Sequence, residues 1–373
     1  MKHINNKAVY PNLIVRLDYI EDNAREISSR CRCENVGVCG IVKGMHSAPE
    51  VAKAMIRGGV SQIGDARLGN LKNLKMAGID LPLLLTRIPM PSEVDALIES
   101  ADISLNSEMT TIKAIDEACI KQNLHHKIVL MCDLGDLREG FIEKEELIQS
   151  AIEIENMSGV ILAGVGTNLG CYGAVKPTIN NLNDLVELAG IIENYIGRSL
   201  EIISGGATST LPMVYEGILP KGVNHLRIGE GILLARDLPD IWNVELPGTH
   251  KDTVLIEAQI VELKRKPSHP IGEIFIDAFG NTPEYEDRGW ETRAILALGR
   301  QDFAFMEQLI PRNEEIKLIG SSSDHLIVTV PEASNYSVGD VMEFEMYYGP
   351  MLFLSGADHI HKTFVNDQLQ KIE

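Results

Sequence analysis

The sequence is short of positive charge and of long apolar runs. Its 373 residues contain 34 Lys and Arg against 53 Asp and Glu, which gives a formal net charge of −19 at pH 7. An acidic surface repels phosphate backbones and anionic lipids, so we expect neither a nucleic-acid partner nor a membrane partner. No stretch approaches the roughly 20 consecutive apolar residues that span a membrane. A local basic pocket for one phosphate group remains compatible with this balance.

Cysteine is also scarce. The chain contains six cysteines, and all of them precede residue 172. Cys31 and Cys33 lie too close together for an ordinary zinc knuckle, and no second pair follows at ligand spacing. Residues 1–7 lack the apolar core of a signal peptide. We therefore expect free thiols and a cytoplasmic protein.

Eight short apolar runs alternate with amphipathic helical patterns over the first 240 residues. This alternation predicts parallel βα units. No glycine-rich dinucleotide motif follows an early strand, and eight units in about 225 residues favour a (β/α)8 TIM barrel over an open doubly wound sheet. The predicted strands are Val36–Val42, Gln62–Gly64, Leu81–Thr86, Ile103–Leu105, Lys127–Cys132, Val160–Val165, Leu200–Ile203 and Leu226–Ile228. The predicted helices include Asp18–Ser29, Ala48–Arg57, Glu108–Gln122, Lys144–Glu155 and Asn180–Tyr195.

The pattern changes after about residue 245. Alternating and β-branched runs, separated by turn clusters, predict a C-terminal antiparallel β domain. The expected α/β architecture is therefore a barrel over residues 1–244 and a β domain over residues 245–373, with the run at 9–17 as a possible further strand of the second domain. The predicted strands of this domain are Thr253–Leu263, Arg293–Leu298, Glu315–Ile319, His325–Val330 and Val341–Met346.

Lys43 directly follows the first predicted barrel strand. Barrel enzymes place their reactive groups at the carboxyl ends of the strands. A lysine withdrawn from water at such a place has a lowered pKa, which suits a Schiff base with an aldehyde. The alternative interpretation is a lysine that snorkels at the barrel rim.

The loops after the seventh and eighth predicted strands are rich in glycine and hydroxyl residues. Barrels commonly bind a phosphate group at these two loops. A phosphorylated aldehyde that joins a lysine is pyridoxal 5′-phosphate (PLP), so PLP is the predicted cofactor. Arg227 would reach its ring nitrogen and leave that nitrogen unprotonated. The phosphate candidates are Ser204, Gly205, Gly206, Thr208, Gly229 and Glu230.

These segments resemble the fold-type III PLP enzymes, and most of all the ornithine/alanine racemase branch of the alanine racemase family. Val42-Lys43 is similar to the family's Schiff-base segment, and residues 133–141 (DLGDLREGF) resemble its D-x-G-x-x-R-x-G segment. The resemblance implies that Arg138 lies near the phenolic oxygen of the cofactor. It implies that Asn168, where histidine is usual, occupies the position that stacks on the ring. It also implies a homodimer whose active sites combine one barrel with the partner's β domain.

The resemblance extends to the second domain. Residues 321–325 (SSSDH) resemble the family's C-M-D-Q stretch, which makes Ser323 and Asp324 the candidates for holding the substrate carboxylate. His46, three residues after Lys43, is a candidate for the cofactor phosphate or for a helix cap.

Racemisation requires an acid or base on each face of the cofactor, because the proton leaves one face of Cα and returns on the other. The family places a tyrosine of the partner subunit opposite the lysine. Counting from Gly272 puts Asp277 at that position, whereas counting back from Gly280 puts Phe279 there. Phenylalanine carries no transferable proton, so Asp277 is the predicted second catalytic residue. Tyr285 and Asp287 are the alternatives, and a turn carboxylate is the simpler interpretation of Asp277.

The leading functional prediction is a PLP-dependent racemase of a basic amino acid such as ornithine or lysine, because an acidic chain with a carboxylate base suits a cationic substrate. An alanine or serine racemase is one alternative. A metal-assisted D-amino-acid dehydratase or aldolase is another, with His325, His359 or His361 as ligands, although no metal site is predicted. A PLP carrier would resemble the barrel alone.

Overall fold

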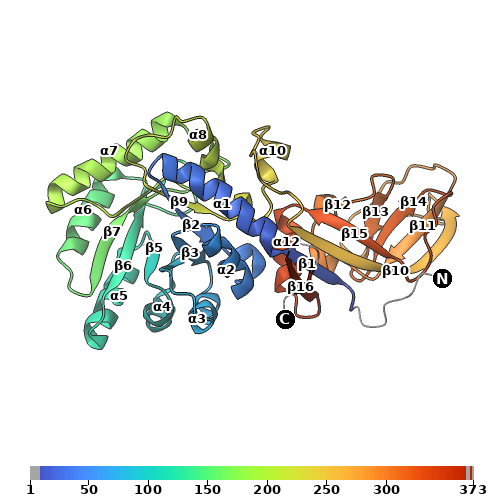
Figure 1. Cartoon of the computed structure of the whole chain (residues 1–373), viewed down its shortest axis with the longest axis horizontal. Coiled ribbons are helices and arrows are strands. Elements are labelled where there is room, and N and C mark those ends of the chain that lie inside the picture. The colour runs from blue at the N-terminus through green and yellow to red at the C-terminus, as the bar shows by residue number, and fades with distance from the viewer. Residues whose placement is uncertain (1–8, 367–369, 372–373) are drawn as a thin grey trace. The chain divides into compact units, whose positions relative to one another are not determined.

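The chain divides into two units, and the first, Leu17–Lys251, is a closed barrel of eight parallel strands (Figure 1). The computed structural model describes residues 9–366 and 370–371. The barrel closes where β9 pairs with β2, with Gly37 opposite His225 and Gly40 opposite Ile228. The barrel strands are β2 (Gly37–Ile41), β3 (Gln62–Asp65), β4 (Leu83–Leu85), β5 (Ile103–Asn106), β6 (His126–Met131), β7 (Val160–Gly166), β8 (Ile202–Ser204) and β9 (His225–Ile228). The predicted TIM barrel is confirmed.

Helices surround the barrel (Figure 1), and the longer ones bury apolar side chains along one face. They are α1 (Leu17–Cys33), α2 (Pro49–Arg57), α3 (Leu68–Met76), α4 (Val94–Ser100), α5 (Met109–Gln122), α6 (Lys144–Glu155), α7 (Ile179–Ile196), α8 (Leu211–Tyr215), α9 (Glu230–Leu233) and α10 (Asp237–Ile241). The barrel interior is closed by apolar side chains that include Cys39, Ile41, Leu84, Ile103, Leu105, Val129, Met131, Ala163 and Ile202. This packed interior leaves the carboxyl ends of the strands as the place for chemistry.

The second unit is built on a nine-stranded sheet with the order β13-β14-β11-β10-β1-β16-β17, to which β15 and β12 are joined through β10. Its pairs are antiparallel except for β1 with β16. The strands are β1 (Asn12–Arg16), β10 (Val254–Pro267), β11 (Trp290–Leu296), β12 (Leu309–Pro311), β13 (Lys317–Ser321), β14 (Leu326–Val330), β15 (Val341–Met346), β16 (His361–Asn366) and β17 (Gln370–Lys371). Two helices, α11 (Arg300–Phe303) and α12 (Tyr348–Gly356), interrupt them.

The division between the units falls after Lys251 rather than after residue 244. The segment before it is fastened to α1, because the Asn23 side chain donates to the carbonyl of His250 at 2.9 Å and accepts from its amide at 2.7 Å. The strand up to Arg16 belongs to the second unit, since β1 pairs with β10 and β16.

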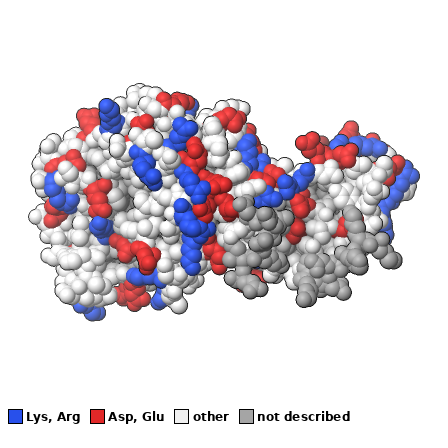
Figure 2. Space-filling view, in the orientation of Figure 1, with Lys and Arg blue, Asp and Glu red and all other residues white. Residues whose placement is uncertain are grey.

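Figure 2 shows positive and negative side chains interspersed over the visible face of the barrel unit, so the acidic surplus does not form one patch there. Within the described residues, no helix combines the length and the apolar character that crossing a membrane requires.

Candidate active site

Lys43 is the first residue of a short 3-10 turn (Lys43–Met45) that follows β2 directly. Its side chain is exposed to solvent at the carboxyl end of that strand. The surrounding protein nevertheless lowers its pKa, mainly by withdrawing the ammonium from water, and the positive charge of Arg138 lowers it further. Arg227, Asp65 and Cys171 also act electrostatically on Lys43, so these groups surround the same point. The amine is therefore both accessible and more readily neutral than an ordinary lysine.

Arg227 is buried on β9, with 5% of its surface exposed. Its guanidinium donates to the carbonyl of Thr167 at 2.8 Å and to the hydroxyl of Ser204. Burial lowers its pKa to about 10, yet the group stays a cation at neutral pH. A fixed cation of this kind suits an unprotonated ring nitrogen, because it can donate a hydrogen bond but cannot supply a full proton readily.

The predicted phosphate loops lie at the ends of β8 and β9. Gly206 has a φ of +114°, a backbone conformation that residues with a side chain rarely adopt. A Cβ there would stand 2.9 Å from Thr210 Oγ1. The Thr208 hydroxyl accepts from the amide of Gly231 at 3.1 Å, which joins the two loops. Gly205 and Gly229 lie against neighbouring residues, since an added Cβ would stand 2.6 Å from Val223 Cγ1 at Gly205 and 3.3 Å from Ile41 Cβ at Gly229. The loops thus offer small residues beside two short helical turns, as phosphate binding requires.

Polar atoms without partners gather at the end of β7. Thr167 Oγ1 and Asn168 Nδ2 are buried and have no hydrogen-bond partner among the described residues. Thr167 also carries the carbonyl that receives Arg227. Buried polar atoms are costly when unpaired. A polar, phosphorylated ring bound beside Lys43 and Arg227 fits this set, because it would give such atoms partners.

Arg138 and His46 both lie on loops at the carboxyl ends of barrel strands. Nε and Nη2 of Arg138 donate to the Glu139 carboxylate, and Nη1 donates to Cys171 Sγ at 3.1 Å. His46 is exposed in a left-handed turn, and its amide donates to the carbonyl of Lys43 at 3.2 Å.

Glu230 turns its carboxylate away from the loop glycines and into the link between α9 and α10. Its Oε1 accepts from the amides of Arg236 at 2.8 Å and Asp237 at 2.9 Å. Burial, together with the charge of Asp237, raises its pKa to about 7. The side chain thus has a structural task, which leaves only the backbone of Glu230 for a phosphate group.

Asp277 lies on the second unit, in a turn before β11. Its Oδ1 accepts from the amides of Phe279 at 2.9 Å and Asn281 at 2.8 Å, and these bonds lower its pKa. The Phe279 ring lies beneath the guanidinium of Arg300, 4.2 Å from ring centre to carbon. Asp277 therefore has the bonding of a turn carboxylate and is a weaker base than an ordinary aspartate.

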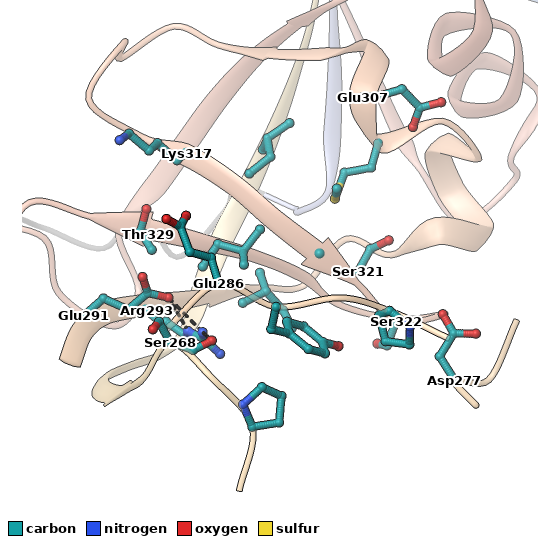
Figure 3. Close-up of a pocket in the computed structure, with 18 of the residues that line it drawn as sticks. Ser268, Asp277, Glu286, Glu291, Arg293, Glu307, Lys317, Ser321, Ser322 and Thr329 are labelled. Atoms are coloured by element: carbon teal, nitrogen blue, oxygen red, sulfur yellow. Dashed lines mark hydrogen bonds and ion pairs between the residues drawn. The ribbon is translucent and has the colours of Figure 1, made fainter. Parts of the chain in front are cut away.

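A cavity of about 1210 Å³ in this unit brings together several of the sequence candidates (Figure 3). It is lined by Asp277, Phe279 and Tyr285 from one segment and by Arg300 and Ser322 from others. At another part of its wall, Arg293 pairs with Glu291 and donates to the carbonyl of Ser268, each at 2.8 Å. Asp277 and Tyr285, two candidates for the second acid/base, therefore line one cavity.

Ser323 and Asp324 occupy the turn between β13 and β14. The Ser323 carbonyl accepts from the amide of Gln301 at 3.2 Å, and the Asp324 carboxylate accepts from the Gln301 side chain at 3.1 Å. A Cβ at Gly299 would stand 1.9 Å from the Ser323 carbonyl oxygen, so the two backbones touch. Among the described residues, no group of three or more His, Cys, Asp or Glu is arranged to hold a metal ion. His359 instead bonds to buried Asp302 at 2.7 Å.

Sequence reasoning missed three buried polar groups around the site. Asp65, at the end of β3, is fully buried and bonded to Ser47. Asp136 is 1% exposed; its Oδ1 accepts from the amides of Cys171 at 3.3 Å and Val175 at 3.2 Å. Its Oδ2 is buried without a partner in the described part of the chain. The third group, His225, bonds to Ser204. A polar residue at the edge of an apolar run was the available signal for Asp65, the last residue of β3, and for His225, the first residue of β9.

Known proteins resemble this chain over nearly its whole length. The family profile described as "Alanine racemase, N-terminal domain" matches residues 15–237. Ornithine racemase of Acetoanaerobium sticklandii is 39% identical over 358 residues, covering 96% of this chain and all 100% of that protein. Lysine racemase of Thermotoga maritima is 35% identical over 356 residues, covering 95% of this chain and 99% of that protein.

Among solved structures, alanine racemase of Clostridium difficile 630 has a similar fold. The TM-score is 0.76 at 16% identity, over 99% of this chain and 98% of that one. At this identity the likeness shows the fold alone, a barrel followed by a β domain.

Proposed function

Because this chain belongs to the alanine racemase family and is a PLP-dependent amino-acid racemase, we propose that its substrate is a basic amino acid such as ornithine or lysine. The observation that carries this proposal is the similarity, over at least 95% of the chain, to an ornithine racemase and a lysine racemase. Alanine and serine are the substrates that the same chemistry would otherwise accept.

Asp136 supports a cationic substrate. Its partnerless Oδ2 is buried beside the loop that carries Arg138, and the Asp136 charge acts on that guanidinium. An isolated buried carboxylate oxygen is unfavourable unless a cation or donor pairs with it. The second ammonium of ornithine or lysine is such a partner, whereas the methyl group of alanine is not.

The cofactor would be held by residues of the barrel unit. We propose that Lys43 is its covalent attachment point, that Arg227 faces the ring nitrogen and that Asn168 lies against the ring. Arg138 would lie near the phenolic oxygen. The phosphate would be held by the loops that follow Ser204 and Ile228, through Gly205, Gly206, Thr208, Gly229 and the backbone of Glu230, with His46 close by. When bound, PLP supplies the electron-withdrawing ring that makes the Cα proton of the amino acid acidic.

Two protein groups then move protons at Cα. Lys43, whose pKa is lowered, accepts or donates the proton on one face. Asp277 of the partner subunit is proposed to serve the other face, with Tyr285 of the partner subunit as the alternative from the same cavity. Ser323 and Asp324 of that subunit would hold the substrate carboxylate. The enzyme would be a homodimer, and its six free cysteines support a cytoplasmic location.

A substrate panel tests the proposal. Wild-type enzyme is incubated with L-ornithine, L-lysine, L-alanine and L-serine, and the enantiomers are separated by chiral chromatography. We expect kcat/KM for ornithine or lysine to exceed that for alanine by roughly a hundredfold. A strong preference for alanine would refute it.

The variant Asp136→Asn sharpens the panel, because Asn keeps an oxygen for the two loop amides while removing the charge. It should erase most of the preference for the basic substrate. The matched control is Asp133→Asn, a neighbouring carboxylate whose oxygen accepts from the amides of Gly135 and Leu137. The control should leave the order of substrates unchanged.

A further inference from the structure

A network of hydrogen-bonded, buried polar side chains connects to Arg227. Arg227 donates to the Ser204 hydroxyl. Ser204 Oγ lies 2.9 Å from His225 Nδ1, and His225 Nε2 lies 2.9 Å from Gln62 Oε1. The four residues come from β3, β8 and β9, and each is less than 9% exposed. This hydrogen-bond network therefore links three barrel strands through side chains alone.

The donors and acceptors of this hydrogen-bond network allow one arrangement of protons. Gln62 Oε1 can only accept, so His225 Nε2 carries a hydrogen. Burial and the charge of Arg227 lower the pKa of His225 to about 3, so the ring is neutral and Nδ1 is an acceptor. The Ser204 hydroxyl must then donate to Nδ1. Its lone pair is left for Arg227, which has donors only.

We propose that Gln62, His225 and Ser204 are positioning residues that fix the guanidinium of Arg227 for its contact with the cofactor ring nitrogen. This inference rests on the proposed role of Arg227. In each hydrogen bond only one partner can be the donor, so each residue fixes the orientation of the next. Gln62 therefore acts on Arg227 through His225 and Ser204. Arg227 also donates to the Thr167 carbonyl at 2.8 Å. The bonds to Ser204 and Thr167 together fix the orientation of the guanidinium.

The barrel contains a matched control pair. Ser104 Oγ lies 2.9 Å from His126 Nε2, and both residues are buried. Burial lowers the pKa of His126 to about 4, so this ring is also neutral at pH 7. The pair bonds to Asn106 rather than to a residue of the cofactor site. It separates the cost of disturbing a buried Ser–His pair from an effect on Arg227.

The experiment compares cofactor-loaded Gln62→Met with wild type and with Ser104→Ala. Methionine has nearly the volume of glutamine but no amide oxygen for His225. We expect Gln62→Met to lower kcat by roughly tenfold to a hundredfold, with KM within about threefold, and to shift the visible absorbance band of the bound cofactor. Ser104→Ala should lower the unfolding temperature while leaving kcat and the band unchanged.

A second measurement is made on the wild-type enzyme and does not depend on the folding of Gln62→Met. Nitrogen-15 NMR of wild-type histidines, assigned with a His225→Gln variant, should show a neutral His225 ring protonated at Nε2. A His225 protonated at Nδ1, or a folded Gln62→Met enzyme with wild-type kcat and absorbance, would overturn the inference. The assays use whichever amino acid the wild type racemises, so rejection of ornithine and lysine would refute the substrate proposal while the positioning test still stands.

Discussion

Lys43 combines two properties that seldom occur together in a lysine. It is reachable from solvent at the end of β2, and the protein around it lowers its pKa. Arg138 and Arg227 contribute by charge, since a second cation nearby favours the neutral amine. A neutral amine is the form that attacks an aldehyde, so the same surroundings that make Lys43 unusual would make it reactive.

The substitution Lys43→Ala tests this residue. It should abolish the visible absorbance band of the lysine-linked cofactor and lower kcat by at least about a thousandfold, because covalent attachment and one acid/base are both removed. The control is Lys53→Ala, an exposed lysine on α2, which should behave as wild type. A variant at position 43 that keeps both the band and the activity would place the attachment point elsewhere.

Among the secondary-structure elements, the strands were the most predictable from sequence. α6 and β15 were predicted to the residue, since each is a clean periodic run between turn signals. No bounds were predicted for helix α3, because its apolar residues follow no strong helical periodicity and its position depends on β3 and β4. Helix α12 was missed because it is apolar on nearly all sides within a strand-rich region.

The site was predictable only in part, for a physical reason. Lys43 and the glycine loops follow from strand ends, which local pattern reveals. The pairing of Arg138 with Glu139, and the turn bonds of Asp277, depend on side-chain geometry that spacing does not specify. His225 lies just before the predicted strand Leu226–Ile228, and only the closed barrel brings it beside Gln62 and Ser204.

The loop between α9 and α10 gives a pH-dependent prediction. The pKa of Glu230 is raised from 4.5 to about 7 in the folded protein. Between these values the folded state holds a proton that the unfolded state has lost, so the folding stability falls as pH rises. Glu230→Gln removes this loss and should raise the free energy of unfolding by about 1 to 3 kcal/mol at pH 8.

Thermal unfolding at pH 5 and pH 8 measures this effect. The gain of Glu230→Gln over wild type should be present at pH 8 and shrink toward pH 5. Glu216→Gln, a change at an exposed carboxylate, serves as the control and should show no such trend. A variant gain that is equal at both pH values would show that Glu230 does not titrate in this range.

At the scale of the whole molecule, the barrel carries the cofactor candidates and the second unit carries Asp277, Ser323 and Asp324. A shared active site would combine the barrel unit of one chain with the second unit of another, so the enzyme would have to be at least a dimer. Light scattering should then give about twice the 41.1 kDa of one chain.

Mixing two inactive variants tests the sharing. Lys43→Ala and Asp277→Asn each remove one residue, and a mixed dimer restores one complete site. Refolding them together should recover about a quarter of wild-type activity, because half of randomly formed dimers are mixed and each has one intact site of two. No recovery would contradict the shared site, and full activity of Asp277→Asn alone would transfer the second-base role to Tyr285.

Racemisation of L-ornithine in deuterium oxide, followed by chiral separation and mass spectrometry, tests whether two bases on opposite faces of Cα transfer the proton. Two bases on opposite faces remove the Cα proton from one side and deliver a solvent-derived one from the other. The two-base mechanism predicts D-ornithine that carries one deuterium at Cα, while the remaining L-ornithine is largely unlabelled at early times. D-ornithine without deuterium, or a keto acid with ammonia in its place, would contradict it.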